Sequence, residues 1–487
     1  MKIWLERYKA FPVQVKASIW FLICSFMQKG ISVITTPIFT RLLTASEYGQ
    51  FNVFDSWLNI VAIFVTLRLY YGVFGQGLIK FEDDRARYAS SMQGLGLVLA
   101  IGWTIVYLIL HQFWNRLFRL TTVQMLAMML MIWATGAFRF WAAEQRVTYK
   151  YRVLVAITIA VSLAKPLLGI FLVIHAEDKV MARIIGLALV EVIGYTGLFF
   201  VQMHRGKQFY SAKYWKHALM FNIPLLPHYL SQTVLNTSDK IMIQRMIGEN
   251  EAGVYSLAYS ISNIMALFNQ ALTQTLTPWI YQKIKASRVK EISSIAYPAL
   301  VGIAGVNLLL IAFAPEAVKI FAPKSYYDAI WVIPPVAMSV YFTFSYYLFS
   351  AFEFYFEKTK FVMYASISGS LLNIILNYIC IQLYGYYAAG YTTLICFIVY
   401  AVAHYLFMRK VCQEFLDGVE VYNPILLFMI SMTFLISGFS LLFTYTIPWL
   451  RYFLILVLAC LMLGFRKKIM NYISFLLTVK TRRDKEK

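Results

Sequence analysis

Long apolar segments, separated by short polar ones, follow one another along the whole chain. Each is long enough to cross a hydrocarbon core of about 30 Å, which takes about 20 residues of helix. Runs such as 94–110 and 153–174 are apolar on all sides, so we expect helices and not barrel strands. We predict about fourteen membrane-spanning helices, at residues 13–35, 51–74, 89–111, 123–142, 153–175, 182–203, 218–244, 252–276, 293–314, 328–351, 361–383, 388–408, 424–446 and 448–465.

The composition is typical of a chain that lies almost entirely in lipid. Of 487 residues, 60% are hydrophobic and 14% are charged, whereas soluble domains have about 45–50% apolar and about 25% charged residues. The five cysteines are scattered, with neither C-x-x-C spacing nor a neighbouring histidine cluster, so we expect no metal site. These features predict an all-α membrane protein with no soluble domain.

The net charge of +21 is distributed in a way that predicts membrane topology. Lysine and arginine concentrate in alternate loops and in the tail at 466–487, which we expect to lie on the anionic inner leaflet. By the positive-inside rule both termini are cytoplasmic, which requires an even number of spanning helices. Glu144 and Glu353 are then expected at cytoplasmic helix ends. Charges dispersed over short segments do not form the continuous basic face of a nucleic-acid-binding protein.

A gap-free internal repeat relates residues 41–64 to residues 245–268, at an offset of 204. Eight of the 24 positions are identical, namely Arg41/Arg245, Glu47/Glu251, Gly49/Gly253, Ser56/Ser260, Asn59/Asn263, Ile60/Ile264, Ala62/Ala266 and Phe64/Phe268. Because the offset covers six predicted helices, we expect two pseudo-symmetric six-helix lobes that run parallel. The predicted division is an N-terminal lobe at 1–203, a cytoplasmic loop at 204–217, a C-terminal lobe at 218–408, two further helices at 424–465 and a basic tail at 466–487.

Polar and ionisable residues within the predicted spans indicate a wet interior, because charge in hydrocarbon is costly and usually faces a cavity or another charge. They are Lys29, Asp55, Arg68, Lys165, Glu191, Asn236, Asp239, Lys240 and Arg245, with Arg41 at an outer helix end. Structural alternatives remain open at this stage. Asp55 and Arg68 could form a buried pair that never meets a substrate. Arg41 and Arg245 could reach the phosphates of ordinary lipids.

The seventh predicted helix is unusually polar and contains two prolines. Pro224 and Pro227 are expected to bend it and to leave backbone carbonyls free for other partners. Asp239 and Lys240 lie further along the same helix. As adjacent helix residues they point about 100° apart, so they need not share one cavity. A bent, polar helix is what we expect beside a gated cavity.

Two segments resemble Wzx-type oligosaccharide flippases of the multidrug/oligosaccharidyl-lipid/polysaccharide exporter superfamily. They are KGISVITTPIFTRLLTASEYGQFNVFDSW and LNTSDKIMIQRMIGENEAGVYSLAYSI, together with the P-W-x-Y at Pro278 to Tyr281. The resemblance implies twelve core helices in two lobes, commonly with two more. It also implies that undecaprenyl-pyrophosphate-linked oligosaccharides cross from the cytoplasmic to the outer face of the inner membrane, for O-antigen, capsule or exopolysaccharide synthesis.

The same resemblance implies roles for the charged residues. The candidate contacts to the anionic headgroup are Lys29, Arg41, Arg68, Asn236, Lys240 and Arg245, and the candidate counter-charges or ion-coupling residues are Asp55, Glu191 and Asp239. No bound cofactor is implied, and a proton gradient, a sodium gradient or the membrane potential would drive turnover. The implied partners are the lipid-linked glycan, membrane lipids and polysaccharide assembly proteins such as a polymerase or a chain-length regulator.

A multidrug or cation antiporter of the same superfamily is the main alternative. Its cavity would be expected to be net acidic, whereas the cations within the predicted spans at least equal the anions. A polymerase or a membrane glycosyltransferase would need a long outer loop or a catalytic carboxylate motif, and the sequence contains neither. We therefore expect a transporter and not an enzyme.

Overall fold

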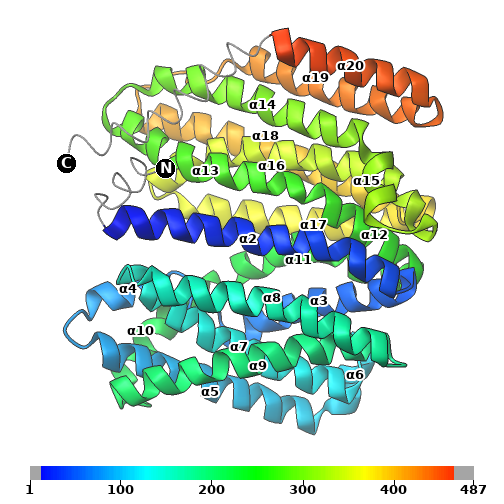
Figure 1. Ribbon diagram of the computed structural model, residues 1–487. Coiled ribbons are helices and arrows are strands. Elements are labelled where there is room, and N and C mark those ends of the chain that lie inside the picture. Colours follow the sequence, from blue (N-terminus) through cyan, green and yellow to red (C-terminus); the bar gives the residue numbers. More distant parts are fainter. Residues whose placement is uncertain (1–12, 465–487) are drawn as a thin grey trace, which may run out of the picture. The chain divides into compact units, whose positions relative to one another are not determined.

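The computed structural model describes residues 13–464, which form helices joined by short turns, without a strand in that range (Figure 1). The basic tail predicted at 466–487 lies outside the described residues. By its internal contacts the chain divides into two compact units, Met1–Gly253 and Val254–Lys487. The first unit contains α2 (Val13–Leu42), α3 (Ala45–Thr66), α4 (Val73–Lys80), α5 (Arg85–Ile109), α6 (His111–Phe118), α7 (Thr122–Val147), α8 (Tyr151–His175), α9 (Lys179–Gly206), α10 (Ala212–Asn222) and α11 (Leu226–Met246).

The second unit begins within α12 (Glu249–Ser262). It continues with α13 (Ile264–Lys285), α14 (Ile292–Ala312), α15 (Ala314–Phe321), α16 (Ile333–Tyr355), α17 (Thr359–Tyr384), α18 (Ala388–Phe415), α19 (Pro424–Phe443) and α20 (Pro448–Gly464). Short 3-10 helices lie at Ile223–Leu225, Val289–Glu291, Lys324–Trp331 and Thr444–Thr446. The fold is therefore all-α, as the apolar pattern predicts.

Each predicted span overlaps a helix of the structure, but the helices are not equally apolar. Among the described helices, nine are long and apolar enough to cross a membrane, or ten if the bent pair Lys324–Trp331 and Ile333–Tyr355 counts as one span. The polar helices α3 and α11 fall outside this set. The number of fourteen crossings and the cytoplasmic position of both termini stay predictions.

The predicted span 51–74 is wrong in its second half. The helix α3 ends at Thr66, because Leu67 and Arg68 both adopt left-handed backbone with φ of 47° and cannot continue a right-handed helix. The carbonyl of Leu67, which no helix satisfies, accepts a hydrogen bond from Asn222 Nδ2 at 2.7 Å. The chain therefore contains a stabilised break between α3 and α4.

The seventh predicted helix, 218–244, is interrupted near its two prolines, Pro224 and Pro227. Between α10 and α11 the chain forms the 3-10 helix Ile223–Leu225, which contains Pro224. Residues 204–217, expected to form a loop, are mostly helical, because α9 runs to Gly206 and α10 begins at Ala212. The span predicted at 252–276 is also interrupted, between α12 and α13.

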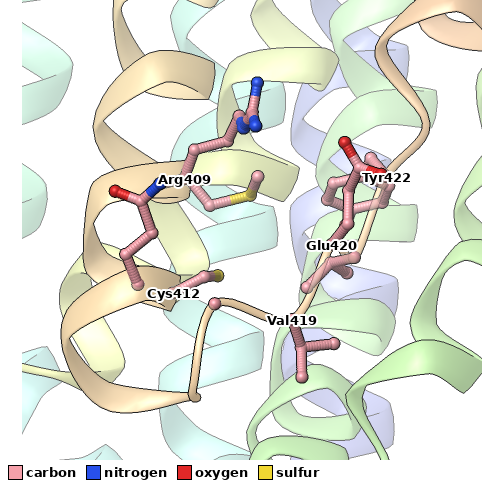
Figure 2. A pocket seen from close by; sticks show the side chains of 9 residues that line it. Arg409, Cys412, Val419, Glu420 and Tyr422 are labelled. Atoms are coloured by element: carbon pink, nitrogen blue, oxygen red, sulfur yellow. The ribbon is translucent and has the colours of Figure 1, made fainter.

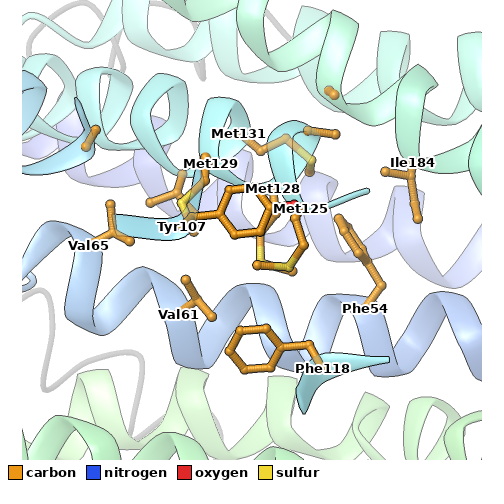
Figure 3. Packing of buried hydrophobic residues seen from close by; sticks show 14 of the residues in the cluster. Phe54, Val61, Val65, Tyr107, Phe118, Met125, Met128, Met129, Met131 and Ile184 are labelled. Atoms are coloured by element: carbon orange, nitrogen blue, oxygen red, sulfur yellow. The ribbon is translucent and has the colours of Figure 1, made fainter. Parts of the chain in front are cut away.

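Methionines of α7 fill the centre of the core of the first unit. Met125, Met128 and Met131 pack with Val61 of α3 and Ile184 of α9 (Figure 3). The flexible thioether side chain fits irregular gaps, which suits a core where several helices meet. One side of α3 is therefore held by apolar packing, which leaves its polar side for other contacts.

The repeat predicted from the sequence is visible in the helix bounds. The ends of α2 and α11 lie 204 residues apart, and so do the starts of α3 and α12. The duplicated Gly49 and Gly253 pack closely: a Cβ at Gly49 would meet the carbonyl oxygen of Glu249, and a Cβ at Gly253 would meet that of Ala45. Both copies thus use a glycine for the same close approach between helices.

The two compact units differ from the two predicted lobes in the place of one helix. The helix α11, assigned to the C-terminal lobe from the sequence, packs against α3. The first unit therefore extends to Gly253 and includes the seventh predicted helix. The arrangement of two parallel six-helix lobes stays a prediction.

Candidate functional site

Arg68 lies in the break between α3 and α4, and its side chain reaches α11. Its Nη2 donates to Thr233 Oγ1 at 3.1 Å, and its guanidinium lies 5.6 Å from the ring centre of Tyr229. Tyr71 meets the same ring edge-on at 5.8 Å, and His228 is within electrostatic reach of Arg68. We call these five residues the arginine group. The break lies within the predicted span 51–74, where non-helical backbone is expected to be buried in protein or to line a cavity.

A second set of ionisable residues connects α3, α8, α9 and α11. We call it the charge group, and it consists of Asp55, Lys165, Glu191, Asp239 and Lys240. Lys165 Nζ lies 2.5 Å from Glu191 Oε1. Asp55 interacts electrostatically with Lys240, Lys165 and Glu191, and Lys240 interacts in turn with Asp55 and Asp239. Although Asp239 and Lys240 are adjacent in sequence, they belong to the same electrostatic network.

The charge group is balanced once Arg183 is counted with its five members. The second carboxylate oxygen of Glu191 accepts a hydrogen bond from Thr135 Oγ1 at 3.0 Å. Arg183, which is also within electrostatic reach of Asp55, lies 3.9 Å from the ring centre of Phe39 and 3.5 Å from that of Phe51. With Arg183 included, three cations face three carboxylates. Such a set can be tolerated in a membrane protein, since each charge has a nearby opposite charge.

The other predicted site residues, Lys29, Arg41, Asn236 and Arg245, are exposed. Lys29 is an exposed residue of α2. Arg41 and Asn236 each donate to a carbonyl one turn earlier on their own helix, at 2.7 Å in both cases. Arg245 donates through Nη2 to the carbonyl of Leu117. The role of these four residues in substrate binding stays a prediction.

The structure therefore brings together four of the predicted residues. Asp55, Glu191, Asp239 and Lys240 meet in the charge group, whereas Arg68 belongs to the arginine group. Asp55 and Arg68 do not form the buried pair considered from the sequence, because Arg68 bonds to a threonine of α11. Across residues 13–464, no set of three or more histidine, cysteine, aspartate or glutamate side chains is placed to hold a metal ion.

Sequence reasoning missed two cations, Arg183 of α9 and Arg139 of α7. Arg139 Nη1 donates to the hydroxyl of Tyr70 at 2.8 Å, and its guanidinium lies 4.8 Å from the centre of that ring. Tyr70 belongs to the same break as Arg68, and Arg146 is within electrostatic reach of Arg139. The signal was present in the sequence, since Arg139 interrupts the apolar span predicted at 123–142. Several arginines thus gather near the break, in contrast to the balanced charge group.

Two family profiles match this chain. The profile of a family described as polysaccharide biosynthesis protein matches residues 15–283, which is more than half of the chain. The profile of the MatE family matches residues 224–379. An uncharacterized membrane protein of Haemophilus influenzae is 21% identical over 373 residues, covering 74% of this chain and 88% of that protein.

Solved structures of transporters share the fold. The lipid II flippase MurJ, in an inward closed conformation, has a TM-score of 0.66 at 15% identity and covers 93% of this chain and 100% of its own. An inward-facing multidrug resistance MATE family transporter of the MOP superfamily has a TM-score of 0.62 at 15% identity, over 81% and 96% of the two chains. The chain thus has the fold of MOP superfamily transporters, and by the profile that matches more than half of its length it belongs to the polysaccharide biosynthesis protein family.

Proposed function

We propose that this protein moves polyprenyl-pyrophosphate-linked oligosaccharides from the cytoplasmic to the outer face of the inner membrane, for O-antigen, capsule or exopolysaccharide assembly. The observation that carries the proposal is Arg68, a cation held on a non-helical break within a predicted span by Thr233 and Tyr229. Membership of the polysaccharide biosynthesis protein family supports this substrate class, and the fold likeness to a lipid II flippase is consistent with it.

The chemistry of the headgroup explains why such a cation is needed. A pyrophosphate diester carries about two negative charges, and these cannot cross hydrocarbon unless fixed groups replace the water around them. The planar guanidinium of Arg68 offers paired N–H donors that match phosphate oxygens. Arg139, tied to the same break through Tyr70, supplies a second guanidinium. The exposed Lys29, Arg41 and Arg245 remain candidates for guiding the headgroup, with Asn236 as a neutral donor.

The charge group is the proposed place of ion coupling, by protons or by sodium. A headgroup that draws Lys240 away would leave Asp55 and Asp239 with less positive charge nearby. The resulting excess of negative charge favours uptake of a cation, with Glu191 as a further counter-charge. Binding of headgroup and binding of ion would then be linked through Lys240. A polymerase or a chain-length regulator is the proposed partner in polysaccharide assembly.

An antiporter of drugs or other cations is the second candidate, because the MatE profile matches residues 224–379. The two candidates differ in what Arg68 would do. For an anionic lipid-linked sugar Arg68 binds substrate, so its loss stops transport. For a cationic drug Arg68 repels substrate, so its loss leaves or improves transport. The effect on transport of removing the charge of Arg68 therefore distinguishes the two functions.

The test measures surface polysaccharide in cells in which this chain is the sole flippase for that polymer. We expect Arg68→Ala and Lys240→Ala to abolish surface polysaccharide while the protein level stays unchanged, and Arg68→Lys to retain part of it. Loss of charge-assisted hydrogen bonds worth about 1.5–3 kcal/mol corresponds to a decrease of about 10- to 100-fold. Lipid-linked oligosaccharide should accumulate on the cytoplasmic leaflet.

The matched control is Arg116→Ala, which removes an exposed arginine of α6 that belongs to neither group. It should leave surface polysaccharide at the wild-type level. Wild-type polysaccharide in both Arg68→Ala and Lys240→Ala would refute the assignment of these cations. Increased export of a cationic dye by Arg68→Ala would favour the antiporter instead.

A further inference from the structure

A carboxylate and an imidazole form a fully buried pair inside the second unit. Glu353, near the C-terminal end of α16, and His404, within α18, both have side chains that are 0% exposed. His404 Nδ1 lies 2.8 Å from each of the two carboxylate oxygens of Glu353. His404 Nε2 is buried and has no hydrogen-bond partner among the described residues. Sequence reasoning placed Glu353 at a helix end and passed over His404.

Aromatic rings enclose this pair. The ring centres of Tyr346, Tyr400 and Phe361 lie 4.6, 4.5 and 5.4 Å from that of His404. The two tyrosines are the titratable neighbours from α16 and α18, and α17 contributes only Phe361. Within residues 13–464, no charged side chain of α13, α14 or α19 contacts the pair. Among the described residues, His404 is the charged or titratable partner that acts on the carboxyl group of Glu353.

The surroundings favour a single proton on the pair. With one proton the pair is net neutral, either as carboxylate and imidazolium or as carboxylic acid and imidazole. With no proton, a negative charge is left among aromatic rings without a cation. With two protons, an imidazolium is left without a carboxylate. Both states carry a large desolvation cost, so gain or loss of a proton requires access to water.

A pocket lies at the C-terminal end of α18 (Figure 2). It is lined by Met408, Arg409, Cys412, Val419, Glu420 and Tyr422, among others. Met408 follows His404 by four residues, so it lies on the same helix face about 6 Å further along. Tyr422 contacts Phe352, the residue before the glutamate, with ring centres 6.4 Å apart. The pocket thus ends one helical turn from the pair, on the side of Arg409 that the charge pattern predicts to be cytoplasmic.

We infer that Glu353 and His404 form a proton-binding site that exchanges its proton with water through this pocket. The proton is held between the carboxylate and His404 Nδ1, and it is released to water when α16 and α18 separate enough to hydrate the pair. No other atom is gained or lost in this step. The proton site stands independently of the proposed substrate, whereas its use in driving transport rests on the proposed function.

Infrared difference spectra of the purified protein in lipid nanodiscs test the site directly. Over the pH range in which the protein stays folded, the wild-type protein should show a carboxyl band that changes in one step as the pair gains or loses its proton. Glu353→Gln, which keeps the side-chain shape, should lack this band. His404→Gln should keep the band but shift its titration midpoint, because the carboxyl then lacks its partner.

The matched control is Glu144→Gln, which removes a buried carboxyl of the first unit that is paired with an arginine. The titrating band should survive in this variant. A band that is unchanged in Glu353→Gln, or a midpoint that is unchanged in His404→Gln, would overturn the inference. A wild-type spectrum without any titrating carboxyl band in this range would also overturn it.

The spectra need no substrate, so their outcome is separate from that of the polysaccharide assay. If the Arg68 variants keep wild-type polysaccharide while the band behaves as expected, the proposed substrate is wrong and the proton site stands. If the Arg68 variants lose polysaccharide while the band does not depend on Glu353, the proton site is wrong and the flippase stands. The two proposals can therefore fail independently.

Discussion

Helices α7 to α9 of the first unit and α16 to α18 of the second share a framework but not their chemistry. The starts of α9 and α18 lie 209 residues apart, and so do their ends. In both units a buried glutamate near the end of the first of these helices reaches the third. Glu144 pairs with Arg205 and accepts from Gln202 Nε2 at 2.6 Å. Glu353 pairs with His404 alone.

The two glutamates do not occupy equivalent positions of the repeat. The backbone N–H of Lys150 donates to the carbonyl of Gln145, and that of Lys358 donates to the carbonyl of Glu353, at 2.8 Å in each case. Gln145 is therefore the counterpart of Glu353, one residue after Glu144. Side chains one residue apart on a helix point about 100° apart, so the two carboxylates face different parts of the third helix.

The partner decides what each glutamate can do. The side chain of Arg205 is 41% exposed, and arginine keeps its charge at all physiological pH, so the Glu144 pair is fixed and partly hydrated. His404 is 0% exposed, and an imidazole can hold either one proton or two, so the Glu353 pair is dry and lacks a permanent cation. One framework thus carries a structural ion pair in one unit and a titratable pair in the other.

The largest expected effect comes from removing the partner of each glutamate. His404→Ala leaves Glu353 buried without a partner, which should cost about 3–5 kcal/mol in the free energy of unfolding. Arg205→Ala leaves Glu144 with Gln202 and with water nearby, which should cost about 1 kcal/mol. Thermal unfolding of the purified variants in nanodiscs measures both. Equal losses would show that the two pairs are energetically alike.

The same two variants should differ in their pH dependence. An isolated buried carboxylate is relieved by taking up a proton, so the loss in His404→Ala should be smaller at about pH 5.5 than at about pH 8. The loss in Arg205→Ala should be nearly independent of pH. Glu353→Gln combined with His404→Gln is the control, since replacing both partners leaves no charge behind and should be less destabilising than His404→Ala.

A smaller effect is expected at the centre of α9 and α18. Glu191 and Tyr400 are counterparts, 209 residues apart, so this position is charged only in the first unit. Lys165→Met should leave Glu191 without its cation and cost about 2 kcal/mol, since Lys165 is partly exposed and Thr135 still donates to the carboxylate. Glu191→Gln in the same chain should recover part of the loss. No loss in Lys165→Met would show that the pair is energetically neutral.

The sequence predicted the helices well, because long apolar runs report directly on spans in lipid. It predicted the interruption at Pro224, where the side chain itself blocks the helix. It did not predict the break after Thr66, since Leu67 and Arg68 have no side-chain feature that marks left-handed backbone. The stabilising contact there comes from Asn222, which is distant in sequence.

The candidate site was predictable in part, for a similar reason. Lys165 and Glu191 both stood out as charges within spans, but only the packing of α8 on α9 shows that they pair. Arg139 was detectable by the same criterion. His404 was not, because a single histidine in an apolar span gives no sign of its partner, and Glu353 lies 51 residues earlier. A single sequence does not show which residues, distant from each other along the chain, form pairs in the fold.

The smallest effect is expected for the hydrogen bond between Ser366 and Tyr400. Tyr400 occupies in α18 the position that the charged Glu191 occupies in α9. The hydroxyls of Ser366 and Tyr400 are 2.8 Å apart, and Tyr400 packs against His404. Ser366→Ala and Tyr400→Phe should each cost about 1 kcal/mol, and the double variant should cost little more than either, because both remove the same bond. Both should also shift the midpoint of the Glu353 band slightly, since the ring against His404 becomes less fixed. Additive losses with an unchanged midpoint would show that this hydroxyl pair does not position the titratable site.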